Sequence, residues 1–290
     1  MNNLFCFGFG YTAGHLVRAL PAGWQVAGTV RHEDGRENTH IFGEAIDFTT
    51  ITHLLLSIPP EEAGDPALPR YHAALRAAPA LRWIGYLSTT GVYGDHAGGL
   101  VDESTPLAPT SDRARRRARA EREWLDFGAE KGVAVQIFRL AGIYGPGRSV
   151  LDDIRAGTAR RIVKPGQLFS RIHVEDIAQV LLAAMAGESA APIFNVCDDE
   201  PAAPAEVVAY GCGLLGVEPP PEIPYEKAEL SPMALTFWRD NKRVDNSLMK
   251  RELKIGLRYP TYREGLAGLL DAMTRRGLSA ARATRPSAGP

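Results

Sequence analysis

The sequence predicts an α/β fold, a doubly wound parallel sheet followed by a smaller C-terminal lobe, on three observations. In the first half, short apolar runs alternate with amphipathic segments, which is typical of strand–helix–strand units. A glycine-rich turn directly follows the first apolar run. Beyond residue 145, prolines and glycines become frequent and helical stretches interrupt irregular chain. We therefore expect residues 1–145 to form the main domain, with return segments at about 170–200, and residues 146–275 to form mainly the smaller lobe.

Five apolar runs are the strand candidates of the main sheet, and they fall at residues 4–7, 24–30, 53–58, 82–88 and 133–140. Residues 12–20 and 68–79 lie between these runs and repeat apolar residues on one helical face, which predicts helices. The chain between the second and third runs is short for a full helix and strand. Residues 44–48 are therefore predicted to form a stunted strand.

The second half contains fewer regular elements. Residues 174–187 and 204–216 are predicted helices, and residues 191–201 are predicted to contain one more strand that ends in an acidic turn. Residues 277–290 have too little apolar content to pack, so we expect a flexible tail there.

Composition is typical of a folded cytoplasmic protein. Hydrophobic residues make up 45% and charged residues 23% of the chain, both near the averages for globular proteins. The formal net charge of -1 gives no general attraction to nucleic acid, and no segment has the length and apolarity of a membrane span. The three cysteines are widely separated, which argues against a disulfide scaffold or a zinc site. We expect no nucleic-acid, membrane or metal partner.

The turn "GFGYTAG" matches the fingerprint of a Rossmann-type dinucleotide site. Gly8 permits a tight turn from strand to helix, Gly10 lets the backbone approach a pyrophosphate, and the small Ala13 lets the helix pack on the strand. The N-terminus of the helix then offers N–H groups to the anion. The alternative is a glycine-rich turn that holds no ligand. Further cofactor contacts are expected from residues beside the turn and at the end of the third run: Tyr11, Thr12 and Ser57.

The residue after the second run favours one form of the cofactor. A site for NAD normally has an acidic residue there to bind the ribose 2′-hydroxyl, whereas this chain has Arg31. An arginine suits the 2′-phosphate of NADP, so we predict NADP over NAD. The alternative is that Arg31 is a solvated surface residue.

Several motifs in order carry a resemblance to a known superfamily: the glycine turn, "HLLLSIPP", "YLSTTGVYG", "FRLAGIYGPGR" and "RIHVEDIAQ". With these, the chain resembles the extended short-chain dehydrogenase/reductase superfamily, whose members include NAD(P)-dependent nucleotide-sugar epimerases, dehydratases and reductases. The resemblance extends from residue 3 to about residue 200, and more faintly to about residue 270. It implies that the smaller lobe binds the substrate.

The resemblance also implies a catalytic set. In the superfamily, a hydroxyl four residues before a Tyr-Gly pair binds the reacting oxygen of the substrate, and Thr89 occupies that position before Tyr93. A tyrosine and a lysine four residues apart on the next helix normally transfer the proton and hold the cofactor ribose. Those two positions hold Arg113 and Arg117 here, so the active site is atypical.

The two arginines leave two interpretations open. Arginine stays protonated in proteins, so Arg113 is not an ordinary proton shuttle, but Arg117 suits a ribose or phosphate contact and the pair suits an anionic substrate. Alternatively, the helix surface is solvated and stabilised by the pairs Arg117/Glu121 and Arg119/Glu123 at i,i+4 spacing.

Other residues are weaker candidates. Tyr93 and Tyr144 are the nearest replacements for the missing acid, with a core position as the alternative for each. His173 is interpreted as structural, and Lys242 and Arg243 are candidates for binding a substrate diphosphate, with surface solvation as the alternative.

These observations support three hypotheses of different classes. The first is an NADP-dependent oxidoreductase or nucleotide-sugar epimerase/dehydratase-like enzyme that acts on an anionic small molecule, with Thr89, Tyr93, Arg113 and Arg117 as catalytic candidates. The second is a non-catalytic NADP-binding sensor or regulatory protein. The third, nucleic-acid binding through the arginine-rich helix, is disfavoured by the interleaved acidic residues. Related enzymes often pair through helices of the nucleotide-binding domain, so a homodimer is compatible with the sequence.

Overall fold

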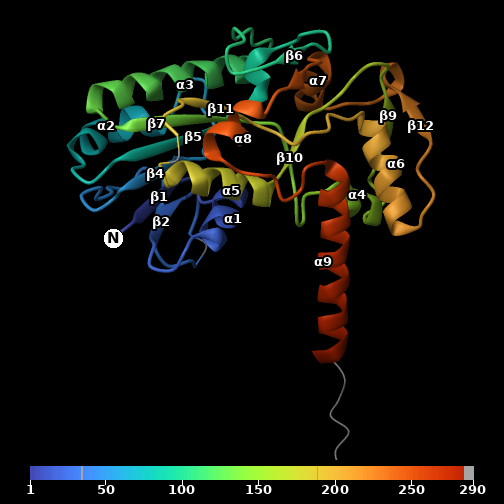
Figure 1. Ribbon diagram of the computed structural model, residues 1–290, viewed down its shortest axis with the longest axis horizontal. Coiled ribbons are helices and arrows are strands. Elements are labelled where there is room, and N and C mark those ends of the chain that lie inside the picture. Colours follow the sequence, from blue (N-terminus) through green and yellow to red (C-terminus); the bar gives the residue numbers. More distant parts are fainter. Residues whose placement is uncertain (34, 188, 284–290) are drawn as a thin grey trace, which may run out of the picture.

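A seven-stranded parallel sheet forms the centre of the protein, whose computed structural model describes residues 1–33, 35–187 and 189–283. Its strands lie in the order β11-β7-β5-β4-β1-β2-β3, and each neighbouring pair is parallel. Their bounds are β1 Asn3–Phe7, β2 Gln25–Val30, β3 Thr39–Ile41, β4 His53–Leu56, β5 Trp83–Thr89, β7 Ala134–Leu140 and β11 Ile193–Val196. The predicted α/β doubly wound fold is confirmed (Figure 1).

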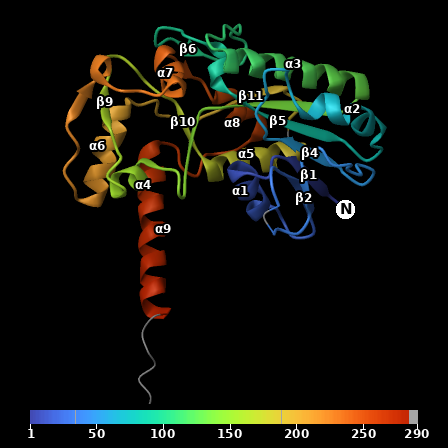
Figure 2. The same cartoon turned by 180° about the vertical axis from the view of Figure 1, so that it is seen from behind.

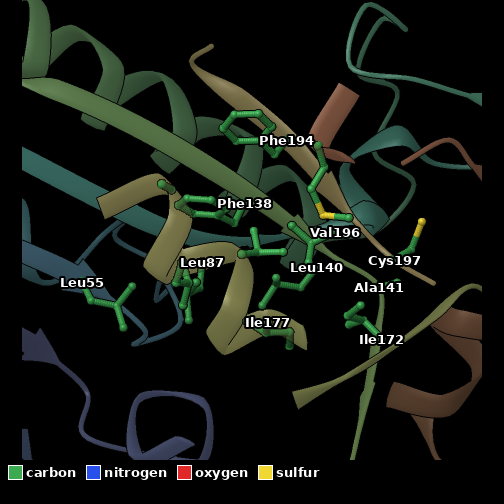
Figure 3. Packing of buried hydrophobic residues seen from close by; sticks show 14 of the residues in the cluster. Leu55, Leu87, Phe138, Leu140, Ala141, Ile172, Ile177, Phe194, Val196 and Cys197 are labelled. Carbon is green, nitrogen blue, oxygen red and sulfur yellow. The ribbon is translucent and has the colours of Figure 1, made fainter. Parts of the chain in front are cut away.

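Helices cover both faces of the sheet, which explains why its central strands are continuous apolar runs. One face packs against α2 (Ala67–Ala77) and α3 (Asp112–Lys131), and the other against α1 (Tyr11–Ala19), α5 (Val174–Met185) and α8 (Ser247–Leu253). Figure 3 shows the second of these cores, where the stacked rings of Phe138 and Phe194 lie 5.9 Å apart and Ile177 approaches from α5.

The predicted stunted strand is wrong in position. Residues 44–48 form no strand. The short strand is β3, which begins five residues before the predicted one and pairs with β2. Phe48 instead packs its ring 5.4 Å from that of Phe5, between the sheet and α2. The apolar residue that suggested a strand therefore belongs to the core of side chains and not to a hydrogen-bonded ladder.

The smaller lobe has its own core. It contains α4 (Val150–Arg155), α6 (Pro204–Leu215), α9 (Tyr262–Ala283) and the parallel pair β9 (Arg161–Val163) and β12 (Glu222–Pro224). Figure 1 and Figure 2 both show α9 projecting from the rest of the molecule. The helix continues through residue 283, so the tail predicted from residue 277 begins inside a helix, and residues 284–290 lie outside the described residues.

The chain returns from the smaller lobe to the main sheet through α7 (Pro232–Arg239) and β13 (Arg243–Val244), which pairs with β6 (Leu100–Val101). Thr110 donates a hydrogen bond of 2.7 Å to the carboxylate of Asp240, and the ammonium of Lys242 donates one of 2.8 Å to the carbonyl of Gly94. A second short parallel pair, β8 (Gly142–Tyr144) and β10 (Arg171–His173), lies between the lobes. These contacts hold the smaller lobe across the carboxyl ends of the main strands.

No helix within the described residues is long and apolar enough to cross a membrane.

Candidate active site

A cleft of about 780 Å³ lies between the carboxyl ends of the strands and the smaller lobe. This is where open α/β sheets bind their ligands, next to the point between β1 and β4 where the strand order reverses. Most of the residues predicted from the sequence to form the site line this one space: Gly10, Tyr11, Thr12, Ser57, Thr89, Arg113 and Arg117. The lining residues do not include Gly8, Ala13, Arg31 and Tyr93.

The glycine turn is shaped as the sequence predicts. Gly8 has a φ of +88°, and a Cβ there would lie 2.7 Å from the side chain of Ile58. A Cβ added to Gly10 would meet no neighbouring heavy atom within 4 Å. Gly10 is also the N-cap of α1 and offers no side chain to the N–H groups of the first turn. The turn can therefore accept a phosphate group that approaches Gly10, and it fits the pyrophosphate of a dinucleotide.

Two arginines lie near the outer end of this turn. Arg31 is exposed and directly follows β2, as predicted, but it does not line the cleft. Arg36, which the sequence reading missed, donates a hydrogen bond of 3.1 Å to the carbonyl of Phe9 and lies over the Phe9 ring, 4.5 Å from its centroid. Arg36 lies in irregular chain between β2 and β3, and no sequence pattern there predicts that it reaches the glycine turn.

Thr89 ends β5 and faces the cleft. Its Oγ1 accepts a hydrogen bond of 3.1 Å from the backbone N–H of Gly91, which fixes the side chain at the start of a 3₁₀ turn, Thr90–Tyr93. The hydroxyl hydrogen stays available for a molecule in the cleft.

Arg117 is buried on the first half of α3, and it does not pair with Glu121. Its Nη1 donates hydrogen bonds to the carbonyl of Leu87 at 2.5 Å and to the hydroxyl of Tyr86 at 3.4 Å. The expected surface pair is thus wrong for Arg117, whereas the pair Arg119/Glu123 is present at 2.6 Å. Spacing along one helix predicted the partner of Arg119 because both residues of that pair face solvent.

Arg113 is exposed at the start of α3 and lines the cleft. Among the described residues its guanidinium has no hydrogen-bond or ion-pair partner, and its Cζ lies 5.7 Å from the centroid of the Phe237 ring on α7. Partial desolvation of the guanidinium in the cleft and the nearby charge of Arg117 both lower the pKa of Arg113. The cleft therefore has, at the start of α3, a cation that pairs with none of the described residues.

Tyr93 lies in the core and not in the cleft. The side chain is fully buried, and its hydroxyl donates a bond of 2.7 Å to Asn195 and accepts one of 2.9 Å from Arg139. Burial raises the pKa of Tyr93. The geometry favours the structural alternative, so the assignment of Tyr93 to the catalytic set is corrected. Tyr144 does line the cleft, but its hydroxyl is directed to the carbonyl of Thr261 at 3.4 Å.

His173 and Asp176 are structural, as the sequence reading favours for His173. His173 is the N-cap of α5, where Nδ1 accepts a bond of 3.2 Å from the N–H of Glu175. Burial lowers the pKa of His173 to about 4. Asp176 accepts backbone hydrogen bonds from Arg258 and Tyr259, which joins α5 to the segment before α9.

The cleft carries an excess of positive charge. Besides Arg113 and Arg117, three cationic side chains line it, against the single lining carboxylate of Asp240 in the described part of the chain: Arg148, Arg171 and Lys242. The side chain of Lys242 is 10% exposed and lies 3.9 Å from Asp240, whereas Arg243 faces outward and donates to the carbonyl of Gly98. Of the two late candidates from the sequence, only Lys242 reaches the cleft.

One buried acid near the cleft was missed by the sequence reading. Asp198 follows β11 and is 2% exposed, and burial raises its pKa to about 8 while the neighbouring Arg171 offsets part of the rise. The sequence predicted only an acidic turn after this strand, because a sequence does not show which of several acidic residues is buried. Within the described residues, no group of His, Cys, Asp and Glu side chains has the geometry of a metal site.

Comparison with known proteins gives matches over most of the chain. Residues 72–197 match the model of the NAD dependent epimerase/dehydratase family. The chain is 30% identical over 246 residues to protein YeeZ of Escherichia coli, which covers 76% of this chain and 86% of YeeZ. It is also 30% identical over 241 residues to a 3-diazoavenalumate denitrifying reductase of a Streptomyces species, covering 75% of this chain and 76% of the reductase.

A solved structure matches more closely still. A conserved protein of unknown function from Silicibacter pomeroyi is 48% identical, with a TM-score of 0.87 over 94% of this chain and 99% of that chain. The fold is therefore shared along nearly the whole length of both chains.

Proposed function

The chain belongs to the NAD-dependent epimerase/dehydratase family, and from that premise we propose that it is an NADP-dependent oxidoreductase or epimerase/dehydratase-like enzyme that acts on an anionic small molecule. The observation that carries this proposal is the continuity of the cleft, which joins the glycine turn at Gly10 to Thr89 and Arg113. A cofactor site and a cationic substrate site thus share one space. One relative that matches over three quarters of this chain is itself named a reductase, which supports the oxidoreductase class.

The residues of the turn would hold the cofactor. The N–H groups at the start of α1 and the open space beside Gly10 suit its pyrophosphate. Arg31, with Arg36 beside the turn, suits a 2′-phosphate at the other end of the adenosine ribose. When bound, a nicotinamide cofactor supplies or accepts a hydride.

The reacting end of the cleft would orient the substrate. The hydroxyl of Thr89 can donate its hydrogen to the reacting oxygen, because the bond from the Gly91 N–H uses only a lone pair of Oγ1. The guanidinium of Arg113 adds positive charge close to that oxygen, and Arg117 reinforces the field while it braces the end of β5. In this scheme Arg113 stabilises negative charge and does not transfer a proton.

The cofactor proposal is tested by titrating the purified protein with NADPH and NADH, following nicotinamide fluorescence. We expect NADPH to bind at least about tenfold more tightly than NADH, since a 2′-phosphate gains charge-assisted hydrogen bonds. Arg31→Ala should remove that preference, and Arg36→Ala should reduce it. Arg251→Ala, an exposed arginine of α8, serves as the matched control. Equal binding of the two nucleotides to the wild type would contradict the NADP assignment.

A second candidate function is favoured by one contact. Arg117 uses Nη1 for the carbonyl of Leu87, and so it serves partly as a structural brace. We therefore also propose, as the alternative, a non-catalytic NADP-binding sensor. Reduction of any carbonyl substrate with NADPH that is lost in Thr89→Ala would rule the sensor out. NADPH binding that changes the affinity of a protein partner, without turnover, would favour it.

A further inference from the structure

The wall that the smaller lobe contributes to the cleft includes an apolar and aromatic patch. Its apolar lining residues come from the segment before β10 and from α7: Leu168, Phe169, Ala234, Phe237 and Trp238. The rings of Phe169 and Trp238 meet edge to face, with centroids 5.3 Å apart. Ser170, Arg171 and Thr236 of the same segments line the cleft beside these residues, so a flat apolar group is favoured only against the aromatic part of the wall.

The Phe237 ring is exposed although its helix is firmly attached. Phe237 is 51% exposed, whereas its neighbour Trp238 is 6% exposed and packs between Phe169 and Tyr225. The backbone carbonyl of Trp238 accepts a hydrogen bond from Lys164. The wall thus presents an aromatic face to the cleft at a fixed position, and this face has little else in the protein to cover it.

A charged side chain, Arg113, lies beside this ring. Its Cζ lies 5.7 Å from the Phe237 centroid, and none of the described residues pairs with its guanidinium. Three of the other lining cations donate to backbone carbonyls: Lys242 to Gly94, Arg171 to Phe169 and Ala202, and Arg117 to Leu87. The fourth, Arg148, lies over the ring of Tyr11 beside the glycine turn, with its Cζ 5.8 Å from the ring centroid. Arg113 is therefore the group best able to bind an anion beside the aromatic wall.

The position of Arg113 limits how far the anion lies from the reacting atom. Arg113 begins the helix that packs on β5, and Thr89 ends β5, so both line the same end of the cleft. A substrate held by both residues carries its negative charge within a few bonds of the oxygen that Thr89 orients. A nucleotide sugar places its diphosphate beyond a polar sugar ring, so its negative charge would lie farther from that oxygen than a group held by Arg113 and Thr89 together.

Resting on the proposed function, we propose that the substrate is a small carboxylate with a planar apolar body, in which the carboxylate binds Arg113 and the planar part stacks against Phe237. Arginine binds carboxylates through two parallel hydrogen bonds. Aromatic groups stack with offset or edge-to-face geometry. The two contacts together select a molecule that is anionic at one end and flat and apolar at the other.

The test measures equilibrium binding to the protein saturated with NADPH, by calorimetry, with trans-cinnamate as the probe. Cinnamamide has nearly the same shape without the charge, and UDP-glucose represents nucleotide sugars. We expect cinnamate to bind at least about tenfold more tightly than cinnamamide, because a charge-assisted pair is lost in the amide. UDP-glucose is expected to bind more weakly than cinnamate.

Two variants separate the contacts. Arg113→Gln should weaken cinnamate about tenfold or more and leave cinnamamide within about twofold. Phe237→Ala should weaken both probes. The matched controls are Arg115→Gln and Leu235→Ala, because Arg115 is exposed and paired with Asp112 and Leu235 is exposed on α7, both outside the cleft lining. Neither control should change the binding of either probe.

The outcomes distinguish this inference from the proposed function. Preference for UDP-glucose, equal affinity for cinnamate and cinnamamide, or no binding of either would overturn the carboxylate proposal. The NADPH dissociation constant of the same proteins, measured by nicotinamide fluorescence, should be unchanged in Arg113→Gln and Phe237→Ala. If the wild type itself fails to bind NADPH, the proposed function fails first.

Discussion

Glu121 and Arg139 form an ion pair of 2.8 Å inside the protein, with side chains that are 2% and 4% exposed. The remaining hydrogen bonds of the pair are supplied locally: Ser88 donates to Glu121, and Arg139 donates to the hydroxyl of Tyr93. Buried charges are tolerated when they are paired and hydrogen-bonded in this way. The network joins α3 to β5 and β7, and thereby fixes the helix that carries Arg113 and Arg117.

Removing one charge of this network should be costly. We expect Glu121→Gln to lower the free energy of unfolding by about 3–5 kcal/mol, because Arg139 is left buried and uncompensated. Glu123→Gln breaks only the exposed pair with Arg119 and should cost less than about 1 kcal/mol. Urea denaturation of both variants measures the difference. Similar losses in the two variants would contradict the role assigned to the buried pair.

For single residues, the sequence predicted which side chains line the cleft better than it predicted which side chains pair with each other. The motif spacing located Arg113, Arg117 and Thr89 at the cleft, because α3 begins beside the end of β5, on which it packs. The partner of Glu121 comes from β7, on a strand whose register with α3 depends on tertiary packing. Tyr93 likewise belongs to the core because Arg139 and Asn195 reach it from other strands.

In the turn between the elements β1 and α1, two glycines are needed for different reasons. At Gly8 the backbone is left-handed and Ile58 leaves no room for a side chain. At Gly10 the backbone has φ of -92° and ψ of -155°, which any residue can adopt, and the space beyond Cα is open. The first glycine is needed to fold the turn, and the second leaves room for a ligand.

The two glycines should therefore respond differently to alanine. Gly8→Ala is expected to lower the free energy of unfolding by about 1–3 kcal/mol, through backbone strain and the clash with Ile58. Gly10→Ala should change stability by less than about 0.5 kcal/mol but weaken NADPH at least about tenfold, since the methyl group occupies the ligand's space. Thermal denaturation and nicotinamide fluorescence give the two readings. Unchanged NADPH affinity in Gly10→Ala would contradict the assignment of the turn.

The elements of the main sheet were predictable because strong apolar periodicity and short loops determine them. The weaker elements were not. The three-residue strand β3 owes its existence to pairing with β2, and α7 was not recognised in a segment whose sequence has no motif. Yet α7 supplies the aromatic wall of the cleft, so the sequence predicted the cofactor side of the site better than the side facing the smaller lobe.

Across the whole molecule, buried titratable groups make stability depend on pH in opposing directions. The pKa of His173 is lowered to about 4, so the unfolded chain binds a proton that the folded protein does not, and stability falls as pH drops from about 6.5 to 4. The pKa of Asp198 is raised to about 8, so its contribution to stability decreases as pH rises from about 4 to 8. The dependence of the free energy of unfolding on pH thus contains both contributions.

A variant isolates the histidine contribution. Asparagine is a good N-cap, so His173→Asn keeps the cap of α5 while removing the titration. Relative to the wild type, the variant should gain about 1–2 kcal/mol in the free energy of unfolding between pH 6.5 and 4.5. Urea denaturation at the two pH values gives this difference. A difference that stays constant would show that His173 titrates normally in the folded protein.

The return segment has a consequence for how the two lobes can change. Residues 94, 95 and 110 of the main domain bind Lys242, Asn241 and Asp240 of the chain that leaves α7. A smaller lobe transplanted from a relative would bring its own return segment, and would have to find matching partners on the loop after β5. The aromatic wall of the cleft and the loop that receives the return segment would therefore have to be exchanged together.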